Sequence, residues 1–172
     1  MADQRCNGWP NRSTWRAALE YLDFDDLRAF ALTEIEAYIR YHNTRNYEAI
    51  MGNAKDMLCD VIDTTLSYSE TWAPDSDDDG VDSEYVAKSV LTDVVVWEGA
   101  WWHNGCISYD DSAIFVEFDD AKRYIYEQAE AFEERESDLD IIADLTEAVI
   151  DDTKYSHETD KNIYYLRRLR YE

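Results

Sequence analysis

The chain has 172 residues, of which 45% are hydrophobic and 14% aromatic, and its formal net charge at pH 7 is −23. The aromatic content excludes a disordered acidic tail, which would lack core-forming side chains. No apolar run approaches the ~20 residues that a membrane-spanning helix needs, and so much negative charge disfavours nucleic acids and anionic membranes as partners.

The length suggests a single domain, residues 1–172, and its first part, residues 1–70, is predicted to be helical. Asn11 and Ser13 are both able to cap a first helix that ends near Tyr21. Apolar residues then recur at three- and four-residue spacing, which is typical of amphipathic helices. We therefore expect three helices, over approximately residues 11–21, 25–43 and 47–67.

A run of acidic residues follows at Pro74. The segment Pro74–Glu84 reads PDSDDDGVDSE and contains no Lys or Arg. Its alternate aspartates followed by Gly80 resemble the first half of an EF-hand calcium loop. The pattern then fails, because Val86 stands where a bidentate glutamate is needed. We therefore expect no metal site and no cofactor. The simplest alternative to a calcium-binding loop is a solvated surface loop.

Residues 71–118 are predicted to combine this acidic loop with a small antiparallel sheet of two to four strands. Thr92–Trp97 and Ala113–Phe118 are rich in β-branched and aromatic residues. Asn104 and Gly105 lie between apolar runs in Trp101–Tyr109, which is a hairpin signal. A short helix over Glu84–Val90 is expected before the sheet.

Residues 119–172 are predicted to be helical again. Asp119 can cap a helix that begins DAKRYIYEQAEAFEE, and a second helical pattern follows either continuously or after a break at Ser137. The apolar residues of His157–Tyr171 predict a basic C-terminal helix. It carries cationic side chains that can brace the acidic helices or form a dimer contact: Arg167, Arg168 and Arg170. The expected fold is α+β, mostly helical with a small central antiparallel sheet.

Negative charge concentrates in residues 71–152, which contain 24 acidic and 4 basic side chains. If the helix there is continuous, its carboxylates form two adjacent stripes with steps of three and four residues. The stripes are Glu127, Glu130, Glu134 and Asp138, and Glu133, Glu136, Asp140, Asp144, Glu147 and Asp151. Like charges at this spacing destabilise a helix by a few tenths of a kcal/mol per pair, so their retention asks for a reason.

Mimicry of DNA is one such reason. A DNA strand presents a charge every ~3.4 Å of its axis, and carboxylates on a rigid helix approximate that row of anions. A protein that presented them would displace counterions from a Lys- and Arg-lined groove and compete with DNA for it. Its large net charge would also accelerate association at low salt.

Three other interpretations remain open. The acidic helix can be an ordinary solvated face. The composition, with 5 Lys against 11 Arg and 23 Asp against 16 Glu, also fits a halophile-adapted acidic protein. An acidic chaperone for a basic protein such as a histone would carry a similar surface.

No sequence motif indicates an enzyme. A nucleophile elbow, a Gly-rich phosphate loop and a zinc-protease motif are all missing from the sequence, and His103 with Cys106 reads as chance proximity across a predicted turn. Three widely spaced cysteines fit free thiols in a reducing compartment. The N-terminus has no apolar signal region. The expected location is therefore the cytoplasm.

Two resemblances suggest an origin in a phage or mobile element. Asn7–Leu19, NGWPNRSTWRAAL, resembles an N-terminal box, NGW-x-N-x-x-TW-x-x-x-L, of small phage and mobile-element proteins, in which Trp9 and Trp15 would be core anchors. The size, the pI of about 4.2 and the carboxylate stripes look like the class of DNA-mimic inhibitors that contains ArdA antirestriction proteins and some anti-CRISPR proteins. That resemblance implies occupation of the DNA site of a defence nuclease, often by a dimer.

The sequence therefore predicts a non-enzymatic inhibitor that mimics DNA. Its expected partner is a positively charged DNA-binding protein or nuclease complex, with no nucleic acid or membrane as partner and a homodimer as a candidate assembly. The predicted partner-binding residues are Asp75, Asp77, Asp78, Asp79, Asp82, Glu127, Glu130, Glu133, Glu134, Glu136, Asp138, Asp140, Asp144, Glu147 and Asp151.

Overall fold

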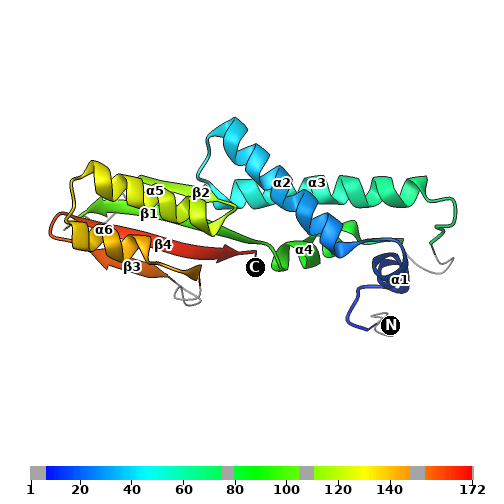
Figure 1. The fold of residues 1–172 in the computed structure, drawn as a ribbon. Coiled ribbons are helices and arrows are strands. Elements are labelled where there is room, and N and C mark those ends of the chain that lie inside the picture. The colour runs from blue at the N-terminus through cyan, green and yellow to red at the C-terminus, as the bar shows by residue number, and fades with distance from the viewer. Residues whose placement is uncertain (1–6, 75–79, 105–110, 148–153, 172) are drawn as a thin grey trace. The chain divides into compact units, whose positions relative to one another are not determined.

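The computed structural model describes residues 7–74, 80–104, 111–147 and 154–171. Over these residues the fold is α+β and mostly helical, with one four-stranded antiparallel sheet, as the sequence predicts (Figure 1). The elements in chain order are α1 (Arg12–Glu20), α2 (Phe24–His42), α3 (Tyr47–Tyr68), α4 (Ser83–Thr92), β1 (Val95–His103), β2 (Asp111–Phe115), α5 (Phe118–Ala131), α6 (Glu136–Ala143), β3 (Tyr155–Glu158) and β4 (Asn162–Arg170).

The chain divides into two compact units. Unit 1 comprises residues 1–38, 48–94 and 171–172, and unit 2 comprises residues 39–47 and 95–170. The expectation that they behave as one domain stays a prediction.

Unit 1 is built from helices whose ends follow the sequence signals. The Asn11 side chain caps α1 by accepting a hydrogen bond from the Thr14 amide, and Asp23 accepts bonds from the first amides of α2. Helix α3 buries residues at three- and four-residue spacing, namely Ile50, Met51, Ala54, Leu58, Ile62 and Leu66. The three N-terminal helices are therefore confirmed.

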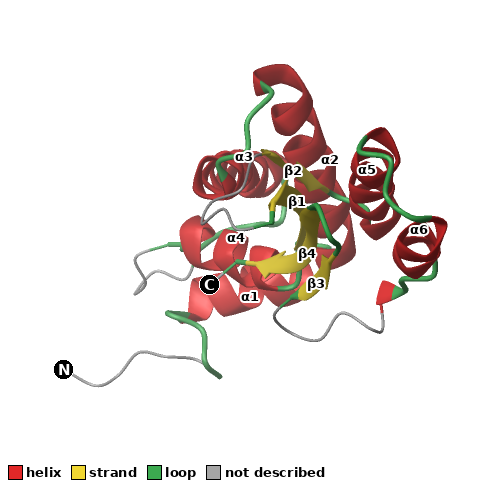
Figure 2. Cartoon of the chain, turned by 90° about the vertical axis from the view of Figure 1, so that its left-hand side faces the viewer, coloured by secondary structure: helices red, strands yellow, loops and turns green. Residues whose placement is uncertain are grey.

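Unit 2 is a sheet with strand order β2-β1-β4-β3 and helices α5 and α6 on one face (Figures 1 and 2). Gly99 lets α5 approach closely, because a Cβ atom there would lie 3.0 Å from the ring of Tyr124 and 3.2 Å from the Ala121 carbonyl oxygen. The core between the layers contains Trp97, Ala121, Ile125, Ala129, Ile142, Leu145, Tyr164 and Leu166.

The predicted basic C-terminal helix is wrong, because this segment forms the antiparallel strands β3 and β4. Three successive residues of β4, Tyr164, Tyr165 and Leu166, are buried. When consecutive side chains of a strand are all buried, its sequence is a continuous apolar run. Such a run lacks the two-residue alternation of a half-buried strand, so periodicity cannot distinguish it from a buried helix. The arginines therefore lie on a strand; Arg167 forms an ion pair with Glu98 at 2.8 Å.

Two further predictions need correction. Thr92–Trp97 and the first part of Trp101–Tyr109 are not separate strands, because both contribute to the single strand β1. Asp119 does not cap α5: the helix begins at Phe118, and Glu117 stands at the cap position without a side-chain bond. The predicted antiparallel pairing in this region is confirmed, with Trp101 opposite Asp111. Gly105, in the predicted turn, lies outside the described residues.

Candidate partner-binding surface

The acidic helix is interrupted between α5 and α6, so the two continuous stripes do not exist. Glu133 adopts a left-handed backbone with φ of 53°. The Glu134 amide donates to the Ala129 carbonyl oxygen at 3.1 Å, and the Glu133 amide donates to that of Glu130 at 3.0 Å. This pair of bonds is a Schellman motif, which ends a helix. Of the two alternatives that the sequence left open, a break is correct, but it lies between Ala131 and Glu136 and not at Ser137, which is inside α6.

Glu134 points into unit 2. Its Oε1 atom accepts three hydrogen bonds, from the Thr159 hydroxyl at 2.9 Å, the Asn162 amide at 2.8 Å and the Tyr164 hydroxyl at 3.1 Å. The donors come from β4 and the turn before it. The Glu134 carboxylate thereby joins the α5–α6 corner to the β3–β4 turn.

The polar groups around Glu134 satisfy one another. Asn162, with 1% of its surface exposed, also donates to the Tyr164 hydroxyl and accepts from His103 Nδ1 at 2.7 Å. Since its amide oxygen accepts only, this contact assigns the proton to His103 Nδ1. Burial raises the pKa of Tyr164, whose hydroxyl is held neutral as a donor. Buried polar networks specify one arrangement when every member is paired.

Asp138 is also turned inward, with 7% of its surface exposed. One carboxylate oxygen lies 3.0 Å from His157 Nε2 on β3, and the other lies 3.4 Å from Arg135 Nε. Arg135 reaches Asp160 as well, at 3.0 Å. The expectation that Asp138 lies on an exposed stripe is therefore wrong, and the first stripe ends at the α5–α6 corner.

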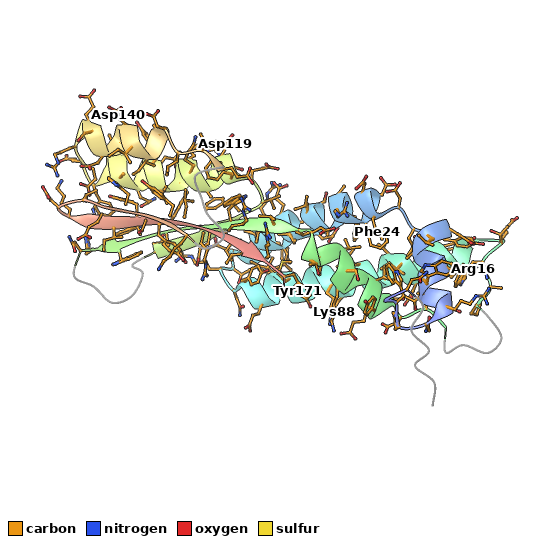
Figure 3. All side chains as sticks on the ribbon, turned by 90° about the horizontal axis from the view of Figure 1, so that it is seen from below. Arg16, Phe24, Lys88, Asp119, Asp140 and Tyr171 are labelled. Carbon is orange, nitrogen blue, oxygen red and sulfur yellow. The ribbon has the colours of Figure 1, made fainter. Side chains whose placement is uncertain are left out.

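Six predicted carboxylates remain on the outside of α5, the corner and α6. All six residues are exposed, and no side chain among them forms an ion pair or hydrogen bond with any residue that the structure describes. Asp140 lies on the side of α6 away from the sheet (Figure 3). We call this set the acidic surface: Glu127, Glu130, Glu133, Glu136, Asp140 and Asp144.

The nearby lysines bind backbone oxygens at helix ends. Lys161 Nζ lies 2.8 Å from the Phe132 carbonyl oxygen and 2.9 Å from that of Glu133, at the end of α5. Lys122 Nζ lies 3.2 Å from the Leu145 carbonyl oxygen, just after α6. Cations at these positions satisfy free carbonyls and favour the helix dipole, so their charge is directed at the backbone.

The other predicted site residues are placed differently. Asp82 caps α4 by accepting from the Tyr85 amide at 2.9 Å. Glu147, beyond the end of α6, lies 3.8 Å from Arg168, and an exposed pair of this kind contributes little to stability. Five predicted residues fall outside the described residues: Asp75, Asp77, Asp78, Asp79 and Asp151.

The N-terminal box contacts the acidic segment and the residue before it, a role that its sequence did not suggest. Within the segment, Asn11 Nδ2 donates to the Gly80 carbonyl oxygen at 2.8 Å, and the Asp82 amide donates to the buried Thr14 hydroxyl at 2.8 Å. Asn11 and Asp82 are the caps of α1 and α4, so each helix start is tied to the other. We call these contacts the cap pair.

Before the acidic segment, α1 makes a second set of contacts. Arg16 donates to the Ala73 carbonyl oxygen at 3.3 Å, and the Tyr21 hydroxyl donates to that of Thr71 at 3.2 Å. The Arg16 guanidinium also lies over the Trp72 ring, 5.2 Å from its centroid. Trp9 packs edge-on against Phe24 at 6.3 Å, but Trp9 and Trp15, the two expected core anchors, are only half-buried.

Within the described residues no group of three or more His, Cys, Asp or Glu side chains is placed to hold a metal ion. Cys106 is outside those residues, and His103 belongs to the Asn162 network. None of the helices found in the described ranges has the length and apolar character needed to cross a bilayer.

Comparisons with protein-family models, with curated proteins and with solved structures found no match.

Proposed function

We propose that the protein is a non-enzymatic inhibitor whose acidic surface occupies the DNA-binding site of a cationic protein, such as a restriction or CRISPR complex. One observation carries the proposal: the six carboxylates of the acidic surface are exposed and have no partner among the described residues. They project from a packed helix–sheet body. The Lys and Arg side chains of a partner can bind a rigid row of carboxylates in place of the phosphates of DNA.

The spacing supports a short mimic. Glu136, Asp140 and Asp144 step by four residues and so recur about every 6 Å along the helix axis. The row therefore has about half the linear charge density of one DNA strand, with a charge every ~3.4 Å. Glu130 and Glu133 on the neighbouring helix and corner add charge beside it. The eight residues of α6 span about 12 Å, or about three to four phosphates.

Glu133 adds support from its backbone. Left-handed φ is unfavourable for a residue with a side chain, and helix ends of this type usually have glycine there. The chain places a carboxylate at this position. Residues held in unfavourable conformations concentrate at functional sites, which fits a role for the Glu133 charge in binding.

Competition with DNA tests the proposal. The immobilised protein captures proteins from a bacterial lysate at low salt, and bound proteins are then challenged with duplex DNA or with a neutral polymer at equal ionic strength. We expect duplex DNA to release a DNA-binding protein and the neutral polymer to leave it bound. Retention that added duplex does not change would refute DNA mimicry, and a captured basic protein that does not bind DNA would favour the acidic-chaperone alternative.

A matched pair of charge variants locates the surface. Glu136→Gln, Asp140→Asn and Asp144→Asn are combined in one protein. The control combines Asp56→Asn, Asp60→Asn and Glu70→Gln, which makes the same charge change at exposed positions of unit 1. Exposed charge pairs contribute about 0.2–1 kcal/mol each, so we expect the first triple variant to bind the captured protein about tenfold more weakly. Equal losses in both would show that only net charge matters.

A further inference from the structure

We infer that Glu134 is a positioning residue: its carboxylate holds the α5–α6 corner on the β3–β4 turn and thereby fixes the direction of the acidic surface. This inference deepens the proposed function and rests on it. It reassigns a residue that the sequence placed among the partner contacts.

The geometry separates Glu134 from its acidic neighbours. All three donors meet a single oxygen, Oε1, and two of them belong to Asn162 and Tyr164, which are 1% and 0% exposed. A carboxylate that accepts hydrogen bonds from buried donors points into the interior of the unit and not toward a partner. Exposed Glu130, one helical turn earlier, has no side-chain partner in the described part of the chain.

The corner needs such a tether because its backbone is unfavourable. Glu133 has positive φ immediately before Glu134, and Asp138, just beyond the corner, is held by His157 on β3. Glu134 and Asp138 therefore attach both sides of the corner to one hairpin. A surface whose side chains are held in their binding geometry avoids the ordering cost that a flexible one incurs on association.

Paired substitutions separate positioning from contact. Glu134→Gln keeps an acceptor oxygen for the three donors but removes the charge, whereas Glu134→Ala removes both. The control pair is Glu130→Gln and Glu130→Ala, in which both changes remove only an exposed charge. Binding is measured with an oligoarginine peptide, by amide NMR shifts over residues 127–144. We expect Glu134→Gln to bind within about threefold of the wild type and Glu134→Ala about tenfold more weakly, while the Glu130 variants weaken binding equally.

A neutral substitution covers the case in which Glu134→Ala does not fold. Thr159→Val leaves every carboxylate in place and removes the hydroxyl that donates to Glu134 and accepts from the Lys161 and Asn162 amides of the β3–β4 turn. We expect it to weaken peptide binding although no charge has changed. Unchanged binding in Thr159→Val, or equal losses in the two Glu134 variants, would overturn the positioning role.

Hydrogen exchange distinguishes failure of this inference from failure of the proposed function. Amides of residues 133–144 should exchange at least about tenfold faster in Glu134→Ala or Thr159→Val than in the wild type, and Glu134→Gln should restore slow exchange. That readout needs no partner. If duplex DNA fails to compete but exchange behaves in this way, the DNA-mimic proposal falls and the tether stands. Unchanged exchange in Thr159→Val refutes the tether.

Discussion

At the residue scale, Glu133 combines an unfavourable backbone conformation with an exposed charge. We expect Glu133→Gly to increase the free energy of unfolding by about 1 kcal/mol, because glycine adopts positive φ without the steric cost of a Cβ atom. The same change should weaken binding to the cationic partner. Urea unfolding measures the first effect, and the lysate-capture assay measures the second.

Glu133→Gln is the control for that prediction. It keeps a side chain at the left-handed position and removes only the charge, so its stability should stay within about 0.5 kcal/mol of the wild type, as for most surface changes. Its binding should fall as far as that of Glu133→Gly. If Glu133→Gly is no more stable than Glu133→Gln, the left-handed position carries no measurable cost.

Single residues were predictable where the signal is local. Asn11 and Ser13 were the two predicted caps of the first helix, and Asn11 is the cap, because capping depends on a side chain and an amide three residues later. The inward direction of Glu134 was not predictable. Its donors lie 25, 28 and 30 residues further along the chain, in a segment that the sequence pattern assigned to a helix.

At the element scale, the cap pair couples the starts of α1 and α4. We expect Asn11→Ala to lower the free energy of unfolding by about 1–2 kcal/mol, since it removes the cap of α1 and the bond to the Gly80 carbonyl oxygen. Urea unfolding monitored by amide exchange in α1 and α4 measures the loss.

Asn11→Asp separates the two contributions. Aspartate keeps the oxygen that caps α1 but has no amide to donate to Gly80. We expect it to recover about half of the loss and to leave the amides at the start of α4 exchanging faster than in the wild type, because the bond to the Gly80 carbonyl oxygen stays lost. Full recovery would mean that the bond between the two helix starts contributes nothing to stability.

Elements with a clear period were predicted well, and those without one were not. The three N-terminal helices and α4 match their expected ranges within a few residues, because one apolar face at 3.6-residue spacing is a strong signal. Strand β4 failed, because its consecutive buried residues have no period. The break after α5 was left open, because the chain has Glu133 at the position where a glycine would have marked the helix end.

At the scale of the whole molecule, mimicry and halophilic adaptation both account for the net charge of −23, and the dependence of stability on salt distinguishes them. Screening is already substantial at ~0.1 M salt, where the Debye length is about 10 Å. We expect the protein to be folded at ~20 mM salt and its melting temperature to rise by about 2–4 °C on going to ~0.2 M, which corresponds to about 1 kcal/mol for a chain of this length. Calorimetry across this range measures the shift.

A halophile-adapted protein behaves differently in the same experiment. It should be unfolded at ~20 mM salt and require molar salt to fold, where the Debye length is only about 3 Å. Folding only above ~1 M salt would favour that alternative. It would contradict DNA mimicry, because a mimic must be folded at the low salt at which it binds its partner.

The division of the carboxylates into inward and outward sets has an evolutionary consequence. Glu134 and Asp138 hold the scaffold through β3 and β4, whereas the side chains of the acidic surface support no other described part of the protein. Substitutions on the outer face can therefore accumulate without refolding the body beneath. Under the proposed function, a lineage carrying this scaffold can follow a drifting target by exchanging side chains on α5 and α6 alone.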